Sequence, residues 1–340
     1  MRGSILHGPG DIRFEVRDDP KIDKPTDAII RVIATCVCGS DLWDFRGINQ
    51  VSEPKAMGHE YVGIVEVVGT DVRTIAPGQF VVGSFFASDN TCENCRVGLQ
   101  SSCIHREFIG VNGAQAEYLR VPLADGTLVA TPDVPTDALI PHLLAASDVL
   151  GTGWFAATAS NVGPGKIVVV VGDGAVGLMG VLAARELGAE RIIMMSRHES
   201  RQRRALDFGA TDIVTERGDD GVARVKDLTG GMGAHSVIEA VGTQESMLQA
   251  IRAARPGGAV GYVGVSHNVV LPGEELFYSH VRLFGGPAPV RRFLPDLIDR
   301  IWHGLIEPGK VFDLTMPLAM VAEGYHAMDE RRAIKVLLRP

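Results

Sequence analysis

The sequence predicts an α/β fold in which a doubly wound parallel sheet is joined to a β-barrel-like domain. Between residues 166 and 286, short apolar strand segments alternate with helical segments, as in a parallel sheet covered by helices on both faces. A glycine-rich turn stands between the first of these strands and the first helix. Residues 1 to 90 instead show short strand segments separated by Gly, Pro and Asp turns, which is typical of a barrel.

Length and composition limit the class of protein. The chain has 340 residues, of which 46% are hydrophobic, so it can form two domains with full cores, and no apolar run is long enough to span a bilayer. We expect no signal peptide, because the first eight residues are too polar. The net charge of −8 argues against a nucleic-acid partner. The odd number of cysteines suits reduced thiols and metal binding, so we expect a cytoplasmic protein; these are Cys36, Cys38, Cys92, Cys95 and Cys103.

In the first ninety residues we expect strands at 27–34, 62–68 and 79–84. Gly58-His59-Glu60 precedes the second of these strands, and Cys38-Gly39-Ser40-Asp41 follows the first. A thiolate and an imidazole are ligands that zinc prefers. The alternative is a buried cysteine and a hydrogen-bonded histidine without a metal. Glu60 and the glycines Gly63 and Gly69 favour zinc, since glycines in such a strand mark bulges or close backbone approach.

Residues 89–103 form a polar lobe with few strand signals and a second group of thiols. Cys92-x-x-Cys95 followed by Cys103 suits a closed, tetrahedral structural zinc site, which needs a fourth ligand. The alternative is three free thiols in a loop.

The second strong motif spans residues 166–187. The apolar strand Lys166–Val171 leads into a glycine turn and then a helix at 178–187. This is the Rossmann dinucleotide fingerprint, in which backbone N–H groups meet a pyrophosphate at a helix N-terminus. The turn residues expected to bind a cofactor are Gly172, Gly174, Ala175, Val176 and Gly177. Further strands are expected at 191–195, 212–214, 236–240, 259–263 and 282–284, then a helix at 291–304 and a strand at 333–338.

The end of the second Rossmann strand predicts the cofactor. An NAD enzyme usually has an acidic residue there, but this chain has Ser196 followed by Arg197. A hydroxyl and a guanidinium bind the 2′-phosphate of NADP, and His198 and Arg201 are near enough in sequence to help. We therefore predict NADP; the alternative is a solvated Arg197 and bound NAD.

These motifs resemble the zinc-dependent medium-chain alcohol dehydrogenase family, in particular its NADP-preferring bacterial secondary alcohol dehydrogenases. The resemblance covers nearly the whole chain. It implies a GroES-like catalytic domain at residues 1–149 and 287–340, with the zinc lobe at 89–103, and a Rossmann domain at 150–286. It also implies reversible hydride transfer between an alcohol, or its aldehyde or ketone, and NADP, with zinc as a Lewis acid. We further expect a homo-oligomer, either a dimer or a tetramer, without a membrane partner.

The resemblance also completes both ligand sets. The third ligand of the catalytic zinc lies on the segment 146–154, where only Asp148 qualifies; its alternative role is a helix N-cap. In the lobe, the family pattern of four cysteines places Asp89 at the position of the first. One carboxylate and three thiolates would then hold a structural zinc.

Further roles follow from the same resemblance. Ser40 is expected to be the first proton carrier, and Asp41 to fix the tautomer of His59. Glu60 is expected to act as a transient ligand or to tune the field at the metal, and Thr152 to contact the cofactor.

One departure from the family pattern leaves the proton route open. Many relatives carry a relay histidine five residues after the ligand cysteine, where this chain has Trp43. The alternatives within the fold are a polyol, sugar or threonine dehydrogenase, and a zinc-free quinone or enone reductase that lacks the ligands. A non-catalytic binding protein is the alternative from another class, and the intact ligand set argues against it. The sequence does not identify the small-molecule substrate.

Overall fold

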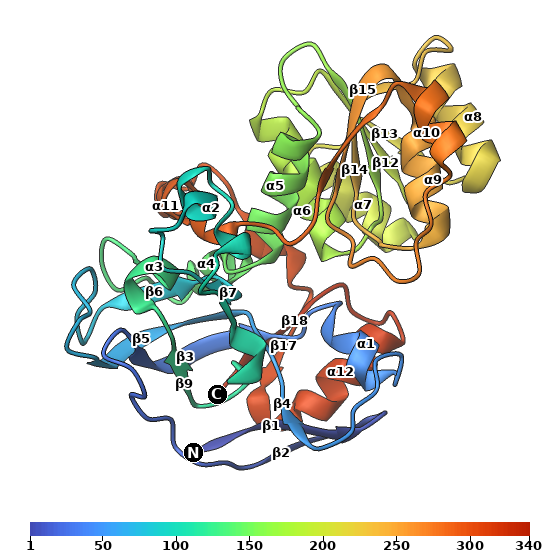
Figure 1. The fold of residues 1–340 in the computed structure, drawn as a ribbon. Coiled ribbons are helices and arrows are strands. Elements are labelled where there is room, and N and C mark those ends of the chain that lie inside the picture. Colours follow the sequence, from blue (N-terminus) through green and yellow to red (C-terminus); the bar gives the residue numbers. More distant parts are fainter. The chain divides into compact units, whose positions relative to one another are not determined.

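The computed structural model describes residues 1–340, and the chain folds into two compact units (Figure 1). The first unit comprises residues 1–151 and 289–340, and the second comprises residues 152–288. The chain passes from the first unit to the second after residue 151 and returns after residue 288. Both boundaries lie two residues beyond those expected from the sequence, 149 and 286. None of the helices combines the length and the hydrophobicity that crossing a membrane requires.

The first unit is built from short strands. Its largest sheet has seven strands in the order β10-β6-β5-β3-β18-β17, with β9 also paired to β3. These strands are β3 (Ala28–Cys36), β5 (Tyr61–Val68), β6 (Phe80–Gly83), β9 (Tyr118–Val121), β10 (Leu128–Ala130), β17 (Leu314–Pro317) and β18 (Val336–Arg339). A three-stranded sheet in the order β2-β1-β4 and a two-stranded β7-β8 sheet accompany it. They consist of β1 (Arg2–Gly8), β2 (Asp11–Val16), β4 (Lys55–Ala56), β7 (Phe86–Ala87) and β8 (Glu107–Phe108).

Short helices connect these strands. They are α1 (Asp41–Phe45), α2 (Glu93–Arg96), α3 (Ala124–Thr127), α4 (Ile140–Ala146), the start of α5 (Val149–Ala159), α11 (Val290–Trp302) and α12 (Val321–Asp329). Four single turns of 3₁₀ helix add to them: η1 (Gln100–Ser102), η2 (Ile109–Val111), η3 (Pro308–Val311) and η4 (Leu318–Met320). Two clusters of buried apolar side chains form the core, one including Ile30 and Leu119 and the other including Leu6 and Phe45.

The antiparallel pair β3–β5 positions the first candidate site. Its register shifts twice, between Ile29 and Ile30 and between Val32 and Ala34. A Cβ atom on Gly63 would lie 2.4 Å from the carbonyl oxygen of Arg31, and one on Gly69 would lie 2.2 Å from that of Pro25. Close backbone approach therefore requires both glycines, as the sequence predicted.

The second unit contains one six-stranded parallel sheet in the order β13-β12-β11-β14-β15-β16, which is the strand order of a doubly wound dinucleotide-binding fold. The strands are β11 (Ile167–Val171), β12 (Arg191–Met195), β13 (Asp212–Val214), β14 (Ala234–Glu239), β15 (Ala254–Tyr262) and β16 (Arg282–Gly285). Helices lie on both sides of this sheet (Figure 1): α6 (Ala175–Glu186), α7 (Glu199–Phe208), α8 (Gly218–Leu228), α9 (Gln244–Ala253) and α10 (Gly273–Ser279). Its core includes Val169, Ile193, Val237 and Ile251.

Candidate active site and metal centres

Three segments of the first unit bring the expected catalytic ligands together. Because β3 and β5 are antiparallel, Cys38, just after β3, and His59, just before β5, lie at the same end of the pair. Asp148 lies between α4 and α5. The hydroxyl of Ser147 accepts a 2.9 Å hydrogen bond from the backbone N–H of Tyr61, which ties this third segment to β5.

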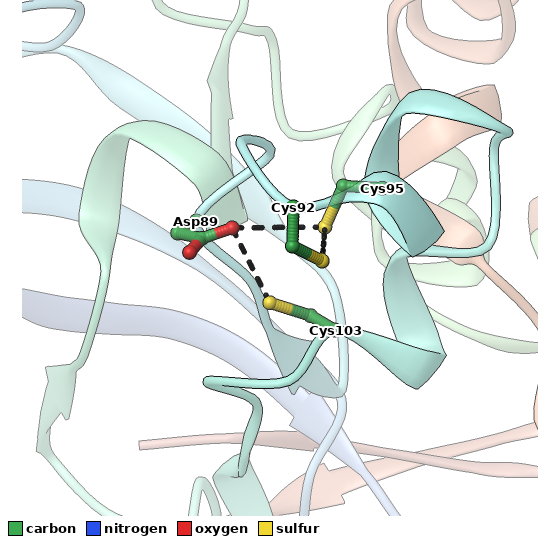
Figure 2. A group of neighbouring side chains, drawn as sticks. All are labelled: Asp89, Cys92, Cys95 and Cys103. Carbon is green, nitrogen blue, oxygen red and sulfur yellow. Dashed lines mark hydrogen bonds between the residues drawn. The ribbon is translucent and has the colours of Figure 1, made fainter.

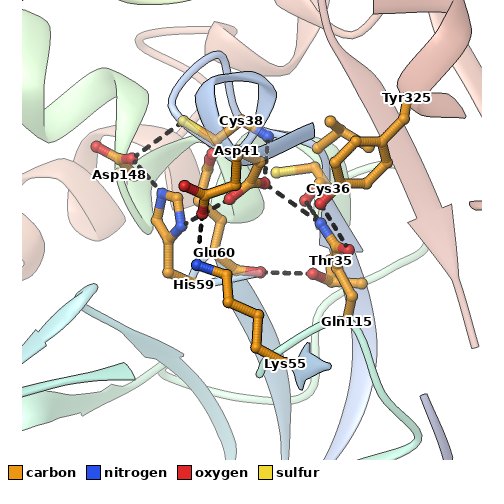
Figure 3. Close-up of polar contacts among 12 residues, drawn as sticks. Thr35, Cys36, Cys38, Asp41, Lys55, His59, Glu60, Gln115, Asp148 and Tyr325 are labelled. Atoms are coloured by element: carbon orange, nitrogen blue, oxygen red, sulfur yellow. Dashed lines mark hydrogen bonds and ion pairs between the residues drawn. The ribbon is translucent and has the colours of Figure 1, made fainter. Parts of the chain in front are cut away.

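The donor atoms of Cys38, His59, Glu60 and Asp148 all lie within 4.8 Å of one another (Figure 3). Asp148 Oδ2 is 3.3 Å from His59 Nε2 and 3.8 Å from Cys38 Sγ. All four residues are buried, and Glu60 has no exposed surface. Such a group of thiol, imidazole and carboxylate donors matches the ligand types that zinc takes in proteins.

The electrostatics of this cluster favour an added cation. Burial and the charge of Glu60 raise the pKa of the Cys38 thiol. Burial lowers the pKa of His59, but Asp41, Cys38 and Asp148 together raise it well above its usual value. Glu60 Oε2 is buried without a hydrogen-bond partner. A divalent metal would satisfy the negative field and stabilise the thiolate, so the residues present fit the metal that the sequence predicted.

Asp41 contacts the Nδ1 side of the His59 imidazole, opposite the side that faces Asp148 (Figure 3). Its Oδ1 lies 3.3 Å from His59 Nδ1, and its Oδ2 accepts a 2.9 Å hydrogen bond from the backbone N–H of Cys38. A proton on Nδ1 leaves the lone pair of Nε2 for a metal, on the side of Asp148. This geometry is compatible with the predicted role of Asp41 in fixing the tautomer of His59, and that role stays a prediction.

Two further polar residues support Asp41, and sequence reasoning missed both. Gln115 Nε2 donates to Asp41 Oδ2 at 3.4 Å and to the carbonyl oxygen of Cys36 at 3.1 Å. Gln115 Oε1 accepts a 3.1 Å hydrogen bond from the hydroxyl of Tyr325 on α12. Nothing in the local sequence around Gln115 distinguishes it from a loop residue.

Glu60 forms a fully buried ion pair with Lys335, which sequence reasoning also missed. Lys335 Nζ lies 2.7 Å from Glu60 Oε1, and the two side chains are 1% and 0% exposed. Lys335 also donates to the carbonyl oxygen of Val37 at 3.3 Å. Burial lowers the pKa of Lys335, but the nearby Cys36 and Glu60 raise it well above the usual value, so the amine is charged. The available signal was a lysine inside the apolar segment 333–338.

The remaining residues expected at this site lie on its helices. Ser40 precedes α1 without a side-chain capping hydrogen bond, and Trp43 lies half-buried on α1. Thr152 is buried on α5, where the second unit begins. The proton-carrier role of Ser40 and the cofactor contact of Thr152 stay predictions.

The lobe brings its four expected ligands together (Figure 2). Asp89 follows β7, Cys92 is the N-cap residue of α2, Cys95 lies within α2, and Cys103 follows η1. Their donor atoms lie within 4.8 Å of one another. Cys92 Sγ is 3.5 Å from Cys95 Sγ, and Asp89 Oδ1 is 3.3 Å from Cys103 Sγ. This arrangement suits a tetrahedral metal.

Hydrogen bonds prepare the carboxylate and one thiol of the lobe. Asp89 Oδ2 lies 2.5 Å from His105 Nδ1, and Asp89 Oδ1 accepts a 2.8 Å hydrogen bond from the backbone N–H of Thr91. Burial raises the pKa of Asp89, but these bonds outweigh it and lower the pKa. Backbone N–H groups, that of Ile104 first, lower the pKa of Cys92 to about 7. Asp89 is therefore an anion, in the form that a metal ligand requires.

In the second unit, the glycine turn lies at the carboxyl end of β11, where the strand order reverses between β11 and β14. Gly172 has a φ of +112°, and a Cβ atom on Gly177 would lie 1.7 Å from the carbonyl oxygen of Gly172. Helix α6 begins at Ala175, so the last three residues of the glycine motif form its first turn. Ligands of doubly wound sheets bind at this switch point, so the local structure fits a dinucleotide pyrophosphate.

Ser196 and Arg201 meet at this edge of the sheet, around a residue that sequence reasoning missed. The hydroxyl of Ser196 donates to Asp173 Oδ2 at 2.7 Å, and Arg201 Nη1 donates to Asp173 Oδ1 at 3.3 Å. Arg197 is exposed, and the backbone N–H of His198 lies 3.4 Å from Ser196 Oγ. The signal for Asp173 was an acidic residue between the first two glycines of the fingerprint.

Comparisons with known proteins agree with both halves of this description. The family model of the alcohol dehydrogenase GroES-like domain matches residues 24–133, and that of zinc-binding dehydrogenases matches residues 175–301. Zinc-type alcohol dehydrogenase B of Aspergillus flavus is 34% identical over all of this chain and 81% of its own length.

Solved structures show the same fold. Alcohol dehydrogenase TADH of Thermus sp. ATN1 is 31% identical and superposes with a TM-score of 0.91 over 100% of this chain and 99% of that one. A zinc-binding dehydrogenase of Sinorhizobium meliloti 1021, solved with NADP bound, is 26% identical with a TM-score of 0.84, over 100% of this chain and 99% of that one.

Proposed function

The chain belongs to the zinc-dependent medium-chain alcohol dehydrogenase family, and on that premise we propose that it transfers a hydride reversibly between an alcohol and NADP. The single observation that carries this proposal is the convergence of Cys38, His59 and Asp148, three buried donors from three segments of the first unit. Catalytic zinc sites have three protein ligands and keep one position open for substrate.

Zinc held by Cys38, His59 and Asp148 would supply Lewis-acid polarisation of the substrate oxygen. The chain's own residues prepare that site. Asp41 fixes the imidazole with its Nε2 lone pair toward the ligand cluster. The ammonium group of Lys335 balances the negative charge of Glu60. The buried carboxylate therefore lies beside the ligands without adding to their net negative charge. Ser40, two residues after the ligand cysteine, is the first group to carry the alcohol proton, while Trp43 closes the route that a histidine would offer.

The choice of NADP is supported by the end of β12. Ser196 and Arg197 stand where an NAD enzyme usually has a carboxylate. Arg197 is exposed, so its guanidinium is accessible to a phosphate group.

Steady-state kinetics with both cofactors test the proposal. A panel of alcohols, aldehydes, ketones, polyols and L-threonine first identifies a substrate, and kcat/KM is then measured with NADP and NAD. Arg197→Ala removes a charge-assisted bond of about 1.5–3 kcal/mol, so the KM for NADP should rise about ten- to a hundredfold while that for NAD barely moves. Arg203→Ala, at an exposed position on α7, is the matched control and should change neither. A wild type that prefers NAD, or an equal effect of Arg197→Ala on both cofactors, would show that the assignment to NADP is wrong.

A further inference from the structure

The carboxylate of Asp173 lies in the glycine turn that is expected to hold the dinucleotide. We propose that Asp173 is a specificity-determining residue. Its negative charge weakens binding of the 2′-phosphate and so lowers the affinity for NADP relative to that for NAD. This inference rests on the proposed function for the identity of the cofactors, but not on which of the two the wild type prefers.

The sheet explains why Asp173 meets the end of the neighbouring strand. Strands β11 and β12 are parallel, with Val171 paired to Met195, so the residues after each strand lie at the same edge. Asp173 is two residues beyond its strand, and Ser196 is the first beyond the other. This is the edge at which doubly wound enzymes recognise the 2′ position of the adenosine ribose.

Both oxygens of Asp173 are engaged in this cluster. Oδ2 accepts a hydrogen bond from the hydroxyl of Ser196, and Oδ1 accepts one from Arg201 Nη1, which also donates to the Asp173 carbonyl oxygen at 3.3 Å. The side chains are largely hidden, with Asp173 11% and Arg201 15% exposed. The three groups therefore form a defined arrangement and not a chance surface contact.

Because Ser196 and Arg201 both bind Asp173, neither is available to bind a phosphate group. A serine hydroxyl can donate only one hydrogen bond, and Ser196 donates its hydrogen bond to Asp173. Toward a ligand, the Ser196 oxygen can therefore act only as an acceptor. The charge of Arg201 is balanced by the carboxylate beside it. A 2′-phosphate would meet a negative group at short range, whereas the 2′-hydroxyl of NAD can donate to Ser196 or to Asp173. Arg197, outside the pair, remains the cation that favours the phosphate.

The neutral variant Asp173→Asn separates charge from shape. The amide oxygen can still accept from Ser196 or Arg201, but the repulsion is gone and the charge of Arg201 becomes available. We expect the Kd for NADP to fall about tenfold while that for NAD changes less than about twofold, with the difference shrinking at high salt. Kd values are measured by calorimetric titration of the purified, zinc-loaded protein with each dinucleotide. Asp207→Asn, at an exposed carboxylate on α7 that pairs with Arg204, is the matched control and should alter neither Kd.

A rise in the Kd for NADP would overturn the inference, because Asp173 would then be ordering Arg201 for the phosphate. Equal changes for both dinucleotides would overturn it as well, by showing a purely structural role. Asp173→Ser, which also lacks the charge, repeats the test if the asparagine disturbs the turn. The two proposals fail separately: a wild type that prefers NAD refutes the assignment to NADP, whereas the direction of the shift in Asp173→Asn decides the role of Asp173.

Discussion

Glu60 and Lys335 show how a single buried residue shapes the catalytic cluster. Neither side chain reaches solvent, and they lie 275 positions apart in the chain. Removing one partner of such a pair leaves an uncompensated charge in the interior, which costs far more than the intact pair contributes. The pair therefore fixes the charge of Glu60 next to Cys38, His59 and Asp148, the residues proposed to hold the metal.

Lys335→Met should consequently destabilise the first unit by about 3–5 kcal/mol, since the methionine replaces the stem but not the charge. The double variant with Glu60→Gln should recover much of that loss, because no unpaired charge remains. The measurement is the urea midpoint of each metal-loaded protein. A single variant as stable as the wild type, or a double variant no better than the single, would contradict this description of the pair.

At the scale of elements, Arg191 and Asp212 join the starts of β12 and β13. Arg191 Nε and Nη2 donate to the two carboxylate oxygens at 2.7 and 2.6 Å, and Arg191 Nη1 also donates to the carbonyl oxygen of Leu228 at the end of α8. The hydrogen bond from Arg191 is the main cause that lowers the pKa of Asp212 below its ordinary 3.8, and burial opposes it. One side chain thus anchors the edge strand and the helix that precedes β14.

Asp212→Asn should lower the melting temperature at pH 7 by about 1–3 °C, because a partly exposed ion pair contributes about 1 kcal/mol or less. The folded pKa lies below the unfolded one, so the stabilisation is complete above pH 3.8 and is lost as pH falls through the lower folded value. Melting curves from pH 7 to pH 2.5 check this. A difference between wild type and variant that stays constant to the lowest pH would exclude the ion pair as its cause.

The lobe is the other element whose role can be measured. If Asp89, Cys92, Cys95 and Cys103 hold a structural zinc, the purified protein contains two zinc ions per chain. Cys95→Ser should reduce this to one and lower the melting temperature by about 5–10 °C, while kcat changes much less. Val97→Ser, at an exposed position in the same lobe, is the control. One zinc in the wild type, together with a neutral Cys95→Ser, would indicate a lobe of free thiols.

For the whole molecule, the sequence predicted those parts of the fold that depend on local pattern. The strands β12 and β13 have the expected bounds, because each is a short apolar run between turn signals. Strand β15 begins at Ala254 instead of residue 259, because Ala254 already pairs with Ala234 on β14. The register then shifts before Ala259 pairs with Ser236, so Pro256 and the glycines after it lie in an irregularity within the strand. The sequence of a single segment does not show which residues of a neighbouring strand it pairs with.

The same limit applies to the site. Cys38 and His59 belong to short motifs whose chemistry is readable, and the structure brings them together with Asp148. Lys335 and Asp173 act through partners on other segments, so the sequence alone could not assign them. The candidate ligands could be predicted from their motifs, whereas the groups that contact them from distant segments required the fold.

For the whole molecule, we propose that hydride transfer depends on zinc held by Cys38, His59 and Asp148, in a chain whose other unit carries the dinucleotide fingerprint. The most direct test is the rate of NADPH oxidation, with the best carbonyl substrate of the panel, in protein stripped of metal and then reloaded with zinc. We predict that activity disappears on stripping and returns on reloading, and that Cys38→Ser stays inactive in both states while its circular dichroism spectrum is unchanged. Full activity in the metal-free protein would show that hydride transfer does not depend on zinc.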